Sequence, residues 1–498
     1  MAGSHEIELK FQVPPGSVAA LRRAVGTATA RTTPLQAVYA DSADARLAAA
    51  GLALRLRREG DAWVQTLKGR GDGLLQRLEH EVPLPAGAGE PRLDPARHAG
   101  TAAGAALQAA LRGAELLPQY RTDIRRLHRV LRRSGSHIEI AFDEGRIVAG
   151  EASLAVCEIE FELKRGSVEV LLQVAADWVR RHGLWLDVRT KSERGFRLAR
   201  KLDQVAAVRA EQGPVVSGGQ RHEVFRSALM ASLAQALPNA AEIAAGTARP
   251  EHLHQLRVAL RRLRTVLRLL ADWGADAARA SALEAAWQGV FAELGGARDT
   301  DAVEAAFGAR LRATMQALSL PPALPATTDT EAATAADPGA RLRDPCFTLQ
   351  VLATLQLAHA PPAPLQPGEA PLRECAAEVL QQAWRAAVRD ARHFERAGVE
   401  ARHRLRKRLK RLRYAAEFLL PVFAPARGER TLKPLRAALE ALGGWHDLQV
   451  AQTHCAKRAG TDPQAAFVLG WLAAQGPAQD RRCAKALRRW VDAPRFWR

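Results

Sequence analysis

Strict alternation of charged and apolar residues marks several short stretches in the first two hundred residues. The first is residues 6–11, where Glu6, Glu8 and Lys10 alternate with three apolar residues. This period of two is typical of a β-strand with two unlike faces. One such stretch describes an ordinary surface strand equally well, so its meaning depends on whether other strands repeat it.

The same alternation returns in at least five later stretches. They are 51–58 with Arg55 and Arg57, 63–69 ending near Lys68, 76–82 with Arg77, Glu79 and Glu81, 137–145 with Asp143, and 157–164 with Glu158, Glu160 and Glu162. Charges protect edge strands, but few sheets have all their strands at an edge. We therefore expect a barrel or cupped sheet whose interior is polar and whose apolar exterior is covered by helices.

The stretch 120–133 is also arginine-rich, but its inward face is ambiguous. Arg121, Arg125 and Arg129 are spaced by four residues, and Arg126 lies beside Arg125. The residues alone therefore leave the inward arginine of this strand open. Buried charges must be paired with charges of the other sign, because an unpaired one costs several kcal/mol.

From residue 221 onward the pattern changes to a helical period, and strand signals almost vanish. The Gly- and Pro-containing segment 206–220 is a credible linker. It separates a first domain, 1–205, from an all-helical domain, 221–495. An internal repeat predicts two related helical bundles, at about 221–318 and 371–495, because HQLRVALRRLR at 254 aligns with HRLRKRLKRLR at 403.

Basic side chains form a stripe on the repeated helix. In the first copy they include His254, Arg257, Arg261 and Arg264, and in the second copy His403, Arg406, Lys410 and Arg413. Like charges at i,i+4 repel each other, so their concentration at matching places favours an anion-binding surface over a merely solvated face.

The charge balance supports a polyanionic partner. The chain of 498 residues has a formal net charge of +19, and residues 1–205 hold 31 Lys and Arg against 25 Asp and Glu, compared with 41 against 28 in the remainder. Aromatic residues make up 5% of the chain, which disfavours nucleic acid held by base stacking. No apolar run reaches the roughly 20 residues that cross a bilayer, and the five scattered cysteines favour a reducing cytoplasm.

The first part resembles the CYTH family, the triphosphate tunnel metalloenzymes. The resemblance rests on Glu6-x-Glu8-x-Lys10, the strands that follow in order, and the Thr190-Lys191-Ser192 segment. It implies an eight-stranded antiparallel β tunnel with flanking helices, which binds a triphosphate and Mg²⁺ or Mn²⁺. Implied phosphate ligands are Lys10, Arg55, Arg57, Lys68, Arg77, Arg125 and Lys191; implied metal ligands are Glu6, Glu8, Glu158 and Glu160; Asp143, Glu79 and Glu81 match further acidic tunnel positions.

The residue types agree with this chemistry. Transfer of a phosphoryl group depends mainly on positioning and on neutralising negative charge. Arginine and lysine supply donors for phosphate oxygens, and carboxylates are hard ligands for Mg²⁺ or Mn²⁺. A second metal or a carboxylate would activate the attacking water.

The helical part resembles the CHAD family through HxxRVxxRRLR and LGxxRD. The resemblance implies a basic channel for inorganic polyphosphate, with the eight stripe residues named above as its ligands. The second copy has His446 where the first has Arg298, so the two halves need not bind equally.

We therefore expect an inorganic triphosphatase with a polyphosphate-binding domain, in the cytoplasm and associated with polyphosphate granules. The substrate of the same tunnel could instead be thiamine triphosphate or a nucleoside triphosphate, or the enzyme could be an adenylate cyclase. A non-catalytic polyphosphate-binding protein is the alternative of another class, and a nucleic-acid binder is disfavoured. Neither the preferred metal nor the oligomeric state follows from the sequence.

Overall fold

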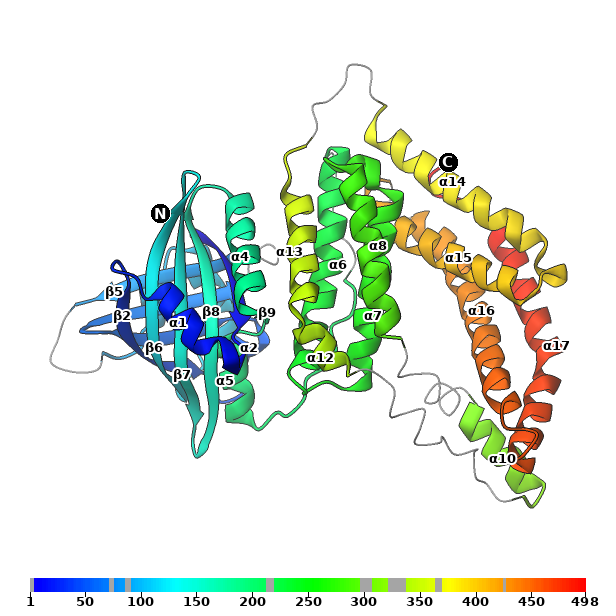
Figure 1. Ribbon diagram of the computed structural model, residues 1–498, viewed down its shortest axis with the longest axis horizontal. Helices are drawn as coiled ribbons and strands as arrows, with labels where there is room; N and C mark the ends of the chain where they lie inside the picture. Colours follow the sequence, from blue (N-terminus) through cyan, green and yellow to red (C-terminus); the bar gives the residue numbers. More distant parts are fainter. Residues whose placement is uncertain are drawn as a thin grey trace. The chain divides into compact units, whose positions relative to one another are not determined.

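The computed structural model describes residues 4–70, 76–85, 91–211, 219–295, 307–320, 337–362, 370–423 and 427–498, without the side chains of Ser4, His5, Arg70, Gln76 and Arg77. The chain divides into two compact units. The first comprises residues 1–210, 232–259 and 338–360; the second comprises 211–231, 260–337 and 361–498. The first unit thus takes in helical segments from beyond the predicted linker at 206–220. Figure 1 shows the chain with its elements labelled.

The described part of the first unit contains nine β-strands, all joined in one sheet. They are β1 Ser4–Gln12, β2 Arg31–Asp41, β3 Ala53–Glu59, β4 Ala62–Arg70, β5 Gln76–Leu84, β6 Leu117–Arg133, β7 Ser136–Ala149, β8 Ala152–Arg165 and β9 Trp185–Leu186. Their order is β5-β4-β3-β2-β6-β7-β8-β1-β9, and β1 also pairs with β5. That last pairing closes β1 to β8 into an antiparallel ring, as expected for a tunnel.

The two faces of each strand meet different surroundings. On β3, Leu54 and Leu56 are buried, whereas Arg55 and Arg57 alternate with them and line an internal cavity. Leu54 packs in an apolar cluster with Leu107 of helix α3 (Ala102–Leu111). Period-two alternation therefore places charged groups inside the ring and apolar groups outside, beneath helices.

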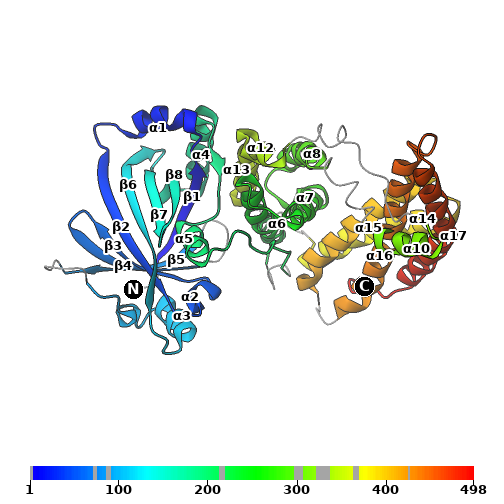
Figure 2. The ribbon, with the colours of Figure 1, turned by 90° about the horizontal axis from the view of Figure 1, so that it is seen from below.

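Helices cover the outside of the ring. In Figure 2, α1 (Val18–Val25) and α4 (Val168–His182) lie on one side of it, and α2 (Arg46–Ala49) and α3 lie on the other. The helix that follows β9, α5 (Lys191–Arg200), packs Phe196 against a cluster that includes Tyr39, Tyr120 and Ile124. Because these three residues also line the cavity, α5 seals an apolar section of the interior.

The rest of the described chain is helical. Its helices are α6 Arg221–Ala244, α7 Pro250–Leu269, α8 Ala277–Glu293, α10 Ala309–Ala317, α12 Pro338–Arg343, α13 Pro345–His359, α14 Leu372–Arg392, α15 Val399–Leu419, α16 Gly428–Ala456 and α17 Pro463–Val491. The expected succession of an α+β part and an all-α part is confirmed. Among the described helices, none is both long enough and apolar enough to span a membrane.

The two copies of the repeated basic motif lie on helices α7 and α15. The LGxxRD motif begins at Leu294 in the first half and at Leu442 in the second. Leu294 follows the end of α8, whereas Leu442 to Asp447 lie within α16. Arg298 and Asp299 lie outside the described residues. In the second unit, Leu311 of α10 packs in one cluster with Leu448 of α16 and Leu472 of α17.

Candidate functional site

A cavity of about 1340 Å³ lies within the first unit and is lined by charged side chains from most strands of the ring. Eleven of the residues predicted for the site line it: Glu6, Glu8, Lys10, Arg55, Arg57, Lys68, Glu79, Glu81, Asp143, Glu160 and Lys191. Acids and bases interleave along its wall. This arrangement makes a strongly charged interior tolerable before any ligand binds.

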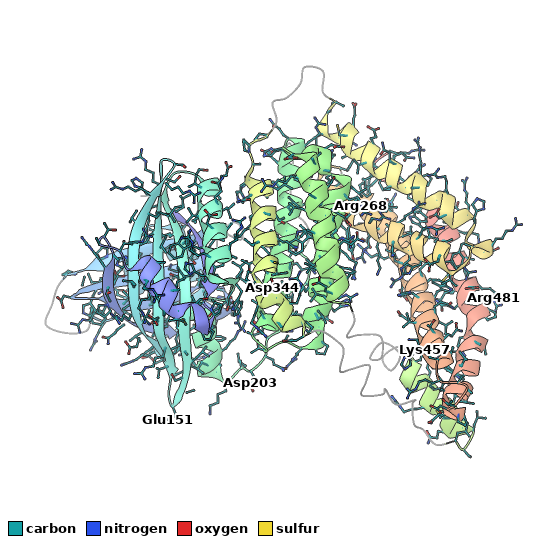
Figure 3. All side chains as sticks on the ribbon, in the orientation of Figure 1. Glu151, Asp203, Arg268, Asp344, Lys457 and Arg481 are labelled. Carbon is teal, nitrogen blue, oxygen red and sulfur yellow. The ribbon has the colours of Figure 1, made fainter. Side chains whose placement is uncertain are left out.

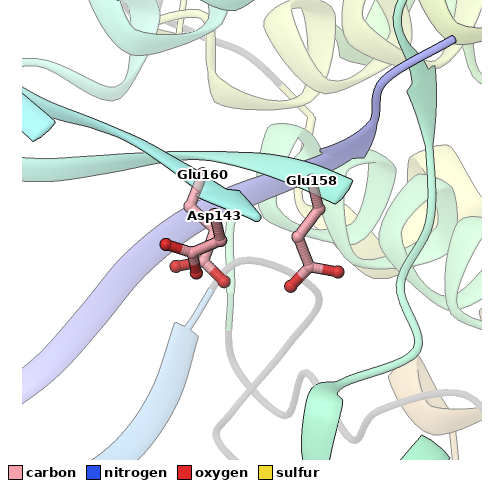
Figure 4. Close-up of side chains that lie close together, drawn as sticks. All are labelled: Asp143, Glu158 and Glu160. Atoms are coloured by element: carbon pink, nitrogen blue, oxygen red, sulfur yellow. The ribbon is translucent and has the colours of Figure 1, made fainter. Parts of the chain in front are cut away.

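Three carboxylates converge at one place, and we call Asp143, Glu158 and Glu160 the acid triad. Asp143 and Glu160 line the cavity, and Glu158 is buried beside them. Asp143 of β7 is the direct partner of Glu158 on β8, and Glu160 follows two residues later on the same face. One oxygen from each side chain lies within 4.8 Å of the others. Figure 4 shows the three side chains extending to the same side of their strands. Asp143 and Glu158 are completely buried.

Three cations balance the triad. Lys191, the first residue of α5, places Nζ 2.7 Å from Asp143, 2.5 Å from Glu158 and 2.8 Å from Glu160. Arg126 contacts Asp143 at 2.7 Å and Glu160 at 2.5 Å. Arg194, one turn after Lys191, pairs with Glu158. Three acidic and three basic side chains therefore meet in a largely buried site.

Mutual pairing keeps these groups ionised. Burial alone would raise the pKa of Glu158, but Lys10, Lys191 and Arg194 lower it to about 2. Burial also opposes ionisation of Glu160, yet Lys191 and Arg126 hold its pKa well below the ordinary value. Burial would lower the pKa of Lys191, whereas the carboxylates of the triad raise it. At neutral pH Glu158 and Glu160 are consequently anionic and Lys191 is cationic.

A second charged group lies elsewhere on the wall. Lys68 bridges Glu6 and Glu79, with Nζ to oxygen distances of 2.9 Å and 3.0 Å. Burial, followed by a hydrogen bond with Glu79, raises the pKa of Glu6. Arg57 lies 3.5 Å from Glu81, and Arg55 donates to the Tyr39 hydroxyl at 3.3 Å. These pairs hold further cations at the cavity surface.

Lys10 of β1 lies next to the acid triad and contacts the loop before α5. Its backbone is paired with that of Glu160, and its ammonium group donates to the backbone carbonyl of Arg189. Burial lowers the pKa of Lys10, although the charge of Glu158 opposes the shift. Glu158 thus only partly offsets the cost of burying the charge of Lys10, which suits a cation that meets an anionic ligand.

Helix α5 is fixed at its first turn and along one face. Thr190 and Glu193 form a reciprocal capping box at its N-terminus, which satisfies two backbone donors. The Tyr120 hydroxyl donates to the Ser192 carbonyl at 3.1 Å. A β-carbon on Gly195 would lie 2.3 Å from the ring of Tyr120, so the glycine allows the helix to approach this closely.

The register of β1 separates the predicted metal ligands. Lys10 lies opposite Glu160 and Gln12 opposite Glu158, while Glu8 lies opposite Glu162. The triad thus gathers Glu158 and Glu160 with Asp143, and Glu8 is about 7 Å along its strand from Lys10. The structure does not bring Glu6 and Glu8 into the triad.

The inward arginine of β6 is Arg126, not Arg125. Arg126 lines the cavity and Arg125 is exposed. Even-numbered residues of β6 point inward, as Thr122 and Ile124 do, so the placement expected for Arg125 is corrected by one position. The side chain of Arg77 lies outside the described residues; its backbone pairs with that of Glu6.

The second unit contains a separate concentration of positive charge. Arg406, Lys410 and Arg413 follow one another on α15, and Arg261 of α7 lies within electrostatic range of Arg406 and Lys410. We call these four residues the basic cluster. In the described part of the chain no carboxylate lies within ion-pair distance of Arg406 or Lys410, and the Nε atoms of Arg261 and Arg406 are buried without a hydrogen-bond partner.

The basic cluster lowers the pKa of its own members. Burial first, then Arg406, Arg261 and Arg413, lower the pKa of Lys410 to about 6. The ring of His446 lies 5.1 Å from that of His403, and burial followed by Arg406 lowers the pKa of His446 to about 4. Arg413 lies 3.5 Å from Glu417, so the cluster is a cationic surface that is only partly balanced within the described residues, with neutral histidines beside it.

The remaining stripe residues are placed differently. Arg264 lies 2.8 Å from Glu284 of α8, and Arg268, labelled in Figure 3, lies 2.9 Å from the same carboxylate. Arg264 is thus already paired. His254 and Arg257 are half-buried on the part of α7 that belongs to the first unit.

Comparison with known families gives two matches that do not overlap. A CYTH domain model matches residues 4–196, and a CHAD domain model matches residues 227–456. An inorganic triphosphatase from Haemophilus influenzae is 31% identical over 207 residues, covering 39% of this chain and 55% of that protein. The alignment thus spans little more than half of that relative's length.

Solved structures resemble each part separately. The CHAD domain from the plant Ricinus communis is 27% identical with a TM-score of 0.43, covering 58% of this chain and 98% of that chain. A Hippeastrum protein described as an adenylyl cyclase candidate with a dominant triphosphatase activity is 17% identical with a TM-score of 0.27, covering 39% of this chain and 95% of that chain.

Proposed function

Because the chain belongs to the CYTH family through residues 4–196 and to the CHAD family through residues 227–456, we propose that it hydrolyses inorganic triphosphate in the β tunnel and binds inorganic polyphosphate through its helical part. The single observation that carries the catalytic proposal is the acid triad, matched charge for charge by Lys191, Arg126 and Arg194.

The donor atoms of the triad suit a hard divalent cation, which would take the place of Lys191 Nζ between the three carboxylates. Its ligands are carboxylate oxygens within 4.8 Å of one another, the donor type that Mg²⁺ and Mn²⁺ prefer. Asp143, Glu158 and Glu160 would hold the ion, and Glu6 and Glu8 stay proposed as further ligands. A bound ion would supply Lewis-acid polarisation of a phosphoryl oxygen and orientation of the phosphate chain.

The cations of the tunnel then bind the phosphates. A triphosphate offers several anionic oxygens, which compete with the triad for Lys191 and Arg126. Arg126 presents a fork that suits two phosphate oxygens, and Lys191 and Lys10 present point charges. Lys68, Arg55 and Arg57 extend this surface along the wall. The protein thereby fixes the chain and neutralises the charge that develops during transfer.

Organic triphosphates stay as alternative substrates. The cavity of about 1340 Å³ exceeds the roughly 300–1,000 Å³ of ordinary ligand pockets, so space for a base or a thiamine group is available. A phosphate-release panel of triphosphate, ATP, thiamine triphosphate and polyphosphate, each with Mg²⁺ and with Mn²⁺, tests this. We expect the highest kcat/KM with inorganic triphosphate. If no substrate of the panel yields phosphate, the protein is not a triphosphate hydrolase, and the non-catalytic polyphosphate-binding protein is the alternative that remains.

The polyphosphate proposal is supported by the basic cluster, whose members have too few carboxylate partners in the described chain. Such a surface also attracts nucleic acid, and competition separates the two ligands. We expect long-chain polyphosphate to displace the protein from DNA far better than DNA displaces polyphosphate. Equal competition would instead favour a general nucleic-acid binder.

A further inference from the structure

We propose that Glu242, on helix α6, is a positioning residue for the tunnel site, because its contacts hold α5 and the loop before it in place. The inference rests on the proposed hydrolysis, for which it names an additional residue. Glu242 contacts no member of the acid triad. It acts through Arg197 and Arg189, which belong to the same short segment as Lys191.

Glu242 makes three contacts in a buried position. Its Oε1 atom accepts a hydrogen bond from Arg197 Nη1 at 2.6 Å. Its Oε2 atom accepts one from the Thr247 hydroxyl at 2.6 Å and lies 4.0 Å from Arg189 Nη1. The residue is 3% exposed, so both of its carboxylate oxygens are used inside the protein.

Arg189 links Glu242 to the β1 side of the site. Arg189 Nε and Nη2 donate to the two oxygens of Asp187 at 3.0 Å and 2.9 Å. Asp187 also accepts from Gln12 at 3.2 Å. The backbone carbonyl of Arg189 accepts from the ammonium group of Lys10. Displacement of Arg189 would consequently move the acceptor that holds Lys10.

Arg197 links Glu242 to the α5 side. Arg197, Arg194 and Lys191 are three residues apart along one helix, so they rotate and translate together. Arg194 and Lys191 contact the acid triad. Arg197, on the same helix, contacts Glu242. A carboxylate at 242 therefore helps to set how deeply two cations enter the triad.

Other contacts from helices α6 and α13 also hold segments near the tunnel site in place. Asn239, one turn before Glu242, accepts from Val208 N at 3.1 Å and donates to Val208 O at 2.9 Å. Thr348 of α13 accepts a hydrogen bond from Leu186 N at 3.0 Å. Leu237, Pro238, Asn239, Glu242, His252 and Leu355 also line the cavity.

Glu242 lies outside the part of the chain that matches the CYTH family. That match ends at residue 196, and Glu242 falls within the CHAD match, 227–456. In this chain, residues of the CHAD part therefore complete the wall of the CYTH tunnel. Substitution of Glu242 should therefore impair hydrolysis of inorganic triphosphate, although this short substrate does not depend on binding to the basic cluster.

The test compares Glu242→Gln with wild type in the full chain. The amide keeps the size of the side chain and removes its charge. We expect kcat for triphosphate to fall about tenfold, since small misplacements of positioned groups have such effects, with a smaller change in KM. Glu242→Asp, which restores the charge, should recover part of the loss. Glu251→Gln, an exposed pair with Arg209 at 3.8 Å, is the matched control and should be unaffected.

Hydrogen exchange provides a readout that does not need turnover. Peptides covering residues 189–200 should exchange faster in Glu242→Gln, while peptides from β7 should not change. Unchanged kcat together with unchanged exchange would overturn the inference. A wild-type protein that releases no phosphate overturns the proposed hydrolysis, and faster exchange in the variant would then still support the positioning role of Glu242.

Discussion

Arg126 donates from Nε to Asp143 Oδ1 and from Nη2 to Asp143 Oδ2, both at 2.7 Å. The two residues are direct partners across β6 and β7, and Asp143 is completely buried. A forked pair of this kind fixes the orientation of both groups. The same Nη2 atom also donates to Glu160 Oε2, at 2.5 Å.

This relationship predicts a contrast between neighbouring arginines. Arg126→Ala should lower kcat/KM for triphosphate about 100-fold, because a cation that neutralises transferred charge is removed. Arg126→Lys should recover only part, since lysine keeps the charge and loses the fork. Steady-state phosphate release with Mg²⁺ measures the effect.

Arg125→Ala is the matched control, because Arg125 is exposed on the same strand. It should leave kcat/KM essentially unchanged. Equal losses in the two variants would contradict the inward placement of Arg126. A thermal melt of each variant separates loss of catalysis from loss of fold, since in Arg126→Ala the buried Asp143 loses one of its two cationic partners and keeps Lys191.

The sequence predicts the charged face of most strands, but not the depth of each residue in the tunnel. Alternation places Glu6, Glu8 and Lys10 on one face of β1 correctly, as their cavity positions indicate. Which of them lies beside Glu160 depends on pairing between β1 and β8, residues that are 150 positions apart. Alternation excludes a shift of the register by one residue, which would turn the charged face outward, but it does not distinguish registers that differ by two residues.

Strand β6 shows a second reason for error. It carries arginines at both odd and even positions, including Arg125 and Arg126, so period-two reasoning has no single solution there. The pairing of Arg126 with Asp143 on the neighbouring strand decides which arginine points inward, and this pairing is visible only in the structure. Glu242 could not be found from the sequence, because it lies in a helical segment with no charge pattern pointing to the tunnel.

The close approach of α5 to Tyr120 gives a second prediction. Gly195→Ala should displace the helix, because the added carbon would lie 2.3 Å from the Tyr120 ring. We expect a lower melting temperature, an overpacking cost of about 1–3 kcal/mol, and a reduced kcat. Gly289→Ala, a helical glycine with open space around it, is the control. An unchanged kcat in Gly195→Ala would contradict the role of α5.

The basic cluster predicts where polyphosphate affinity resides. Arg406→Ala should weaken binding of long-chain polyphosphate about tenfold, because a charge-assisted hydrogen bond contributes about 1.5–3 kcal/mol. Arg404→Ala removes an exposed arginine from the same helix and should have a much smaller effect. Titration calorimetry at fixed salt measures both. A comparable loss in Arg404→Ala would indicate a diffuse charge effect.

Lys410 makes the same binding depend on pH. Burial and three neighbouring arginines lower its pKa to about 6, so the lysine is largely neutral at pH 7.5. A bound polyanion favours the charged form and raises the pKa. Binding should therefore take up protons, and affinity should fall as pH rises above 6.

Calorimetry in buffers of different ionisation enthalpy counts these protons. We expect uptake of up to one proton more in wild type than in Lys410→Arg, which is charged throughout. Equal uptake by the two proteins would assign the protons elsewhere, for example to His403. The arginine variant should also bind polyphosphate with a flatter pH dependence.

Metal-dependent release of phosphate from inorganic triphosphate tests the central claim most directly, in wild type and in Glu160→Gln. Glu160 belongs to the acid triad and touches both Lys191 and Arg126. We predict that wild type releases phosphate only when Mg²⁺ or Mn²⁺ is added, and that Glu160→Gln is at least about 100-fold slower with an unchanged circular dichroism spectrum. Full activity in a chelator, or full activity of the variant, would contradict the account.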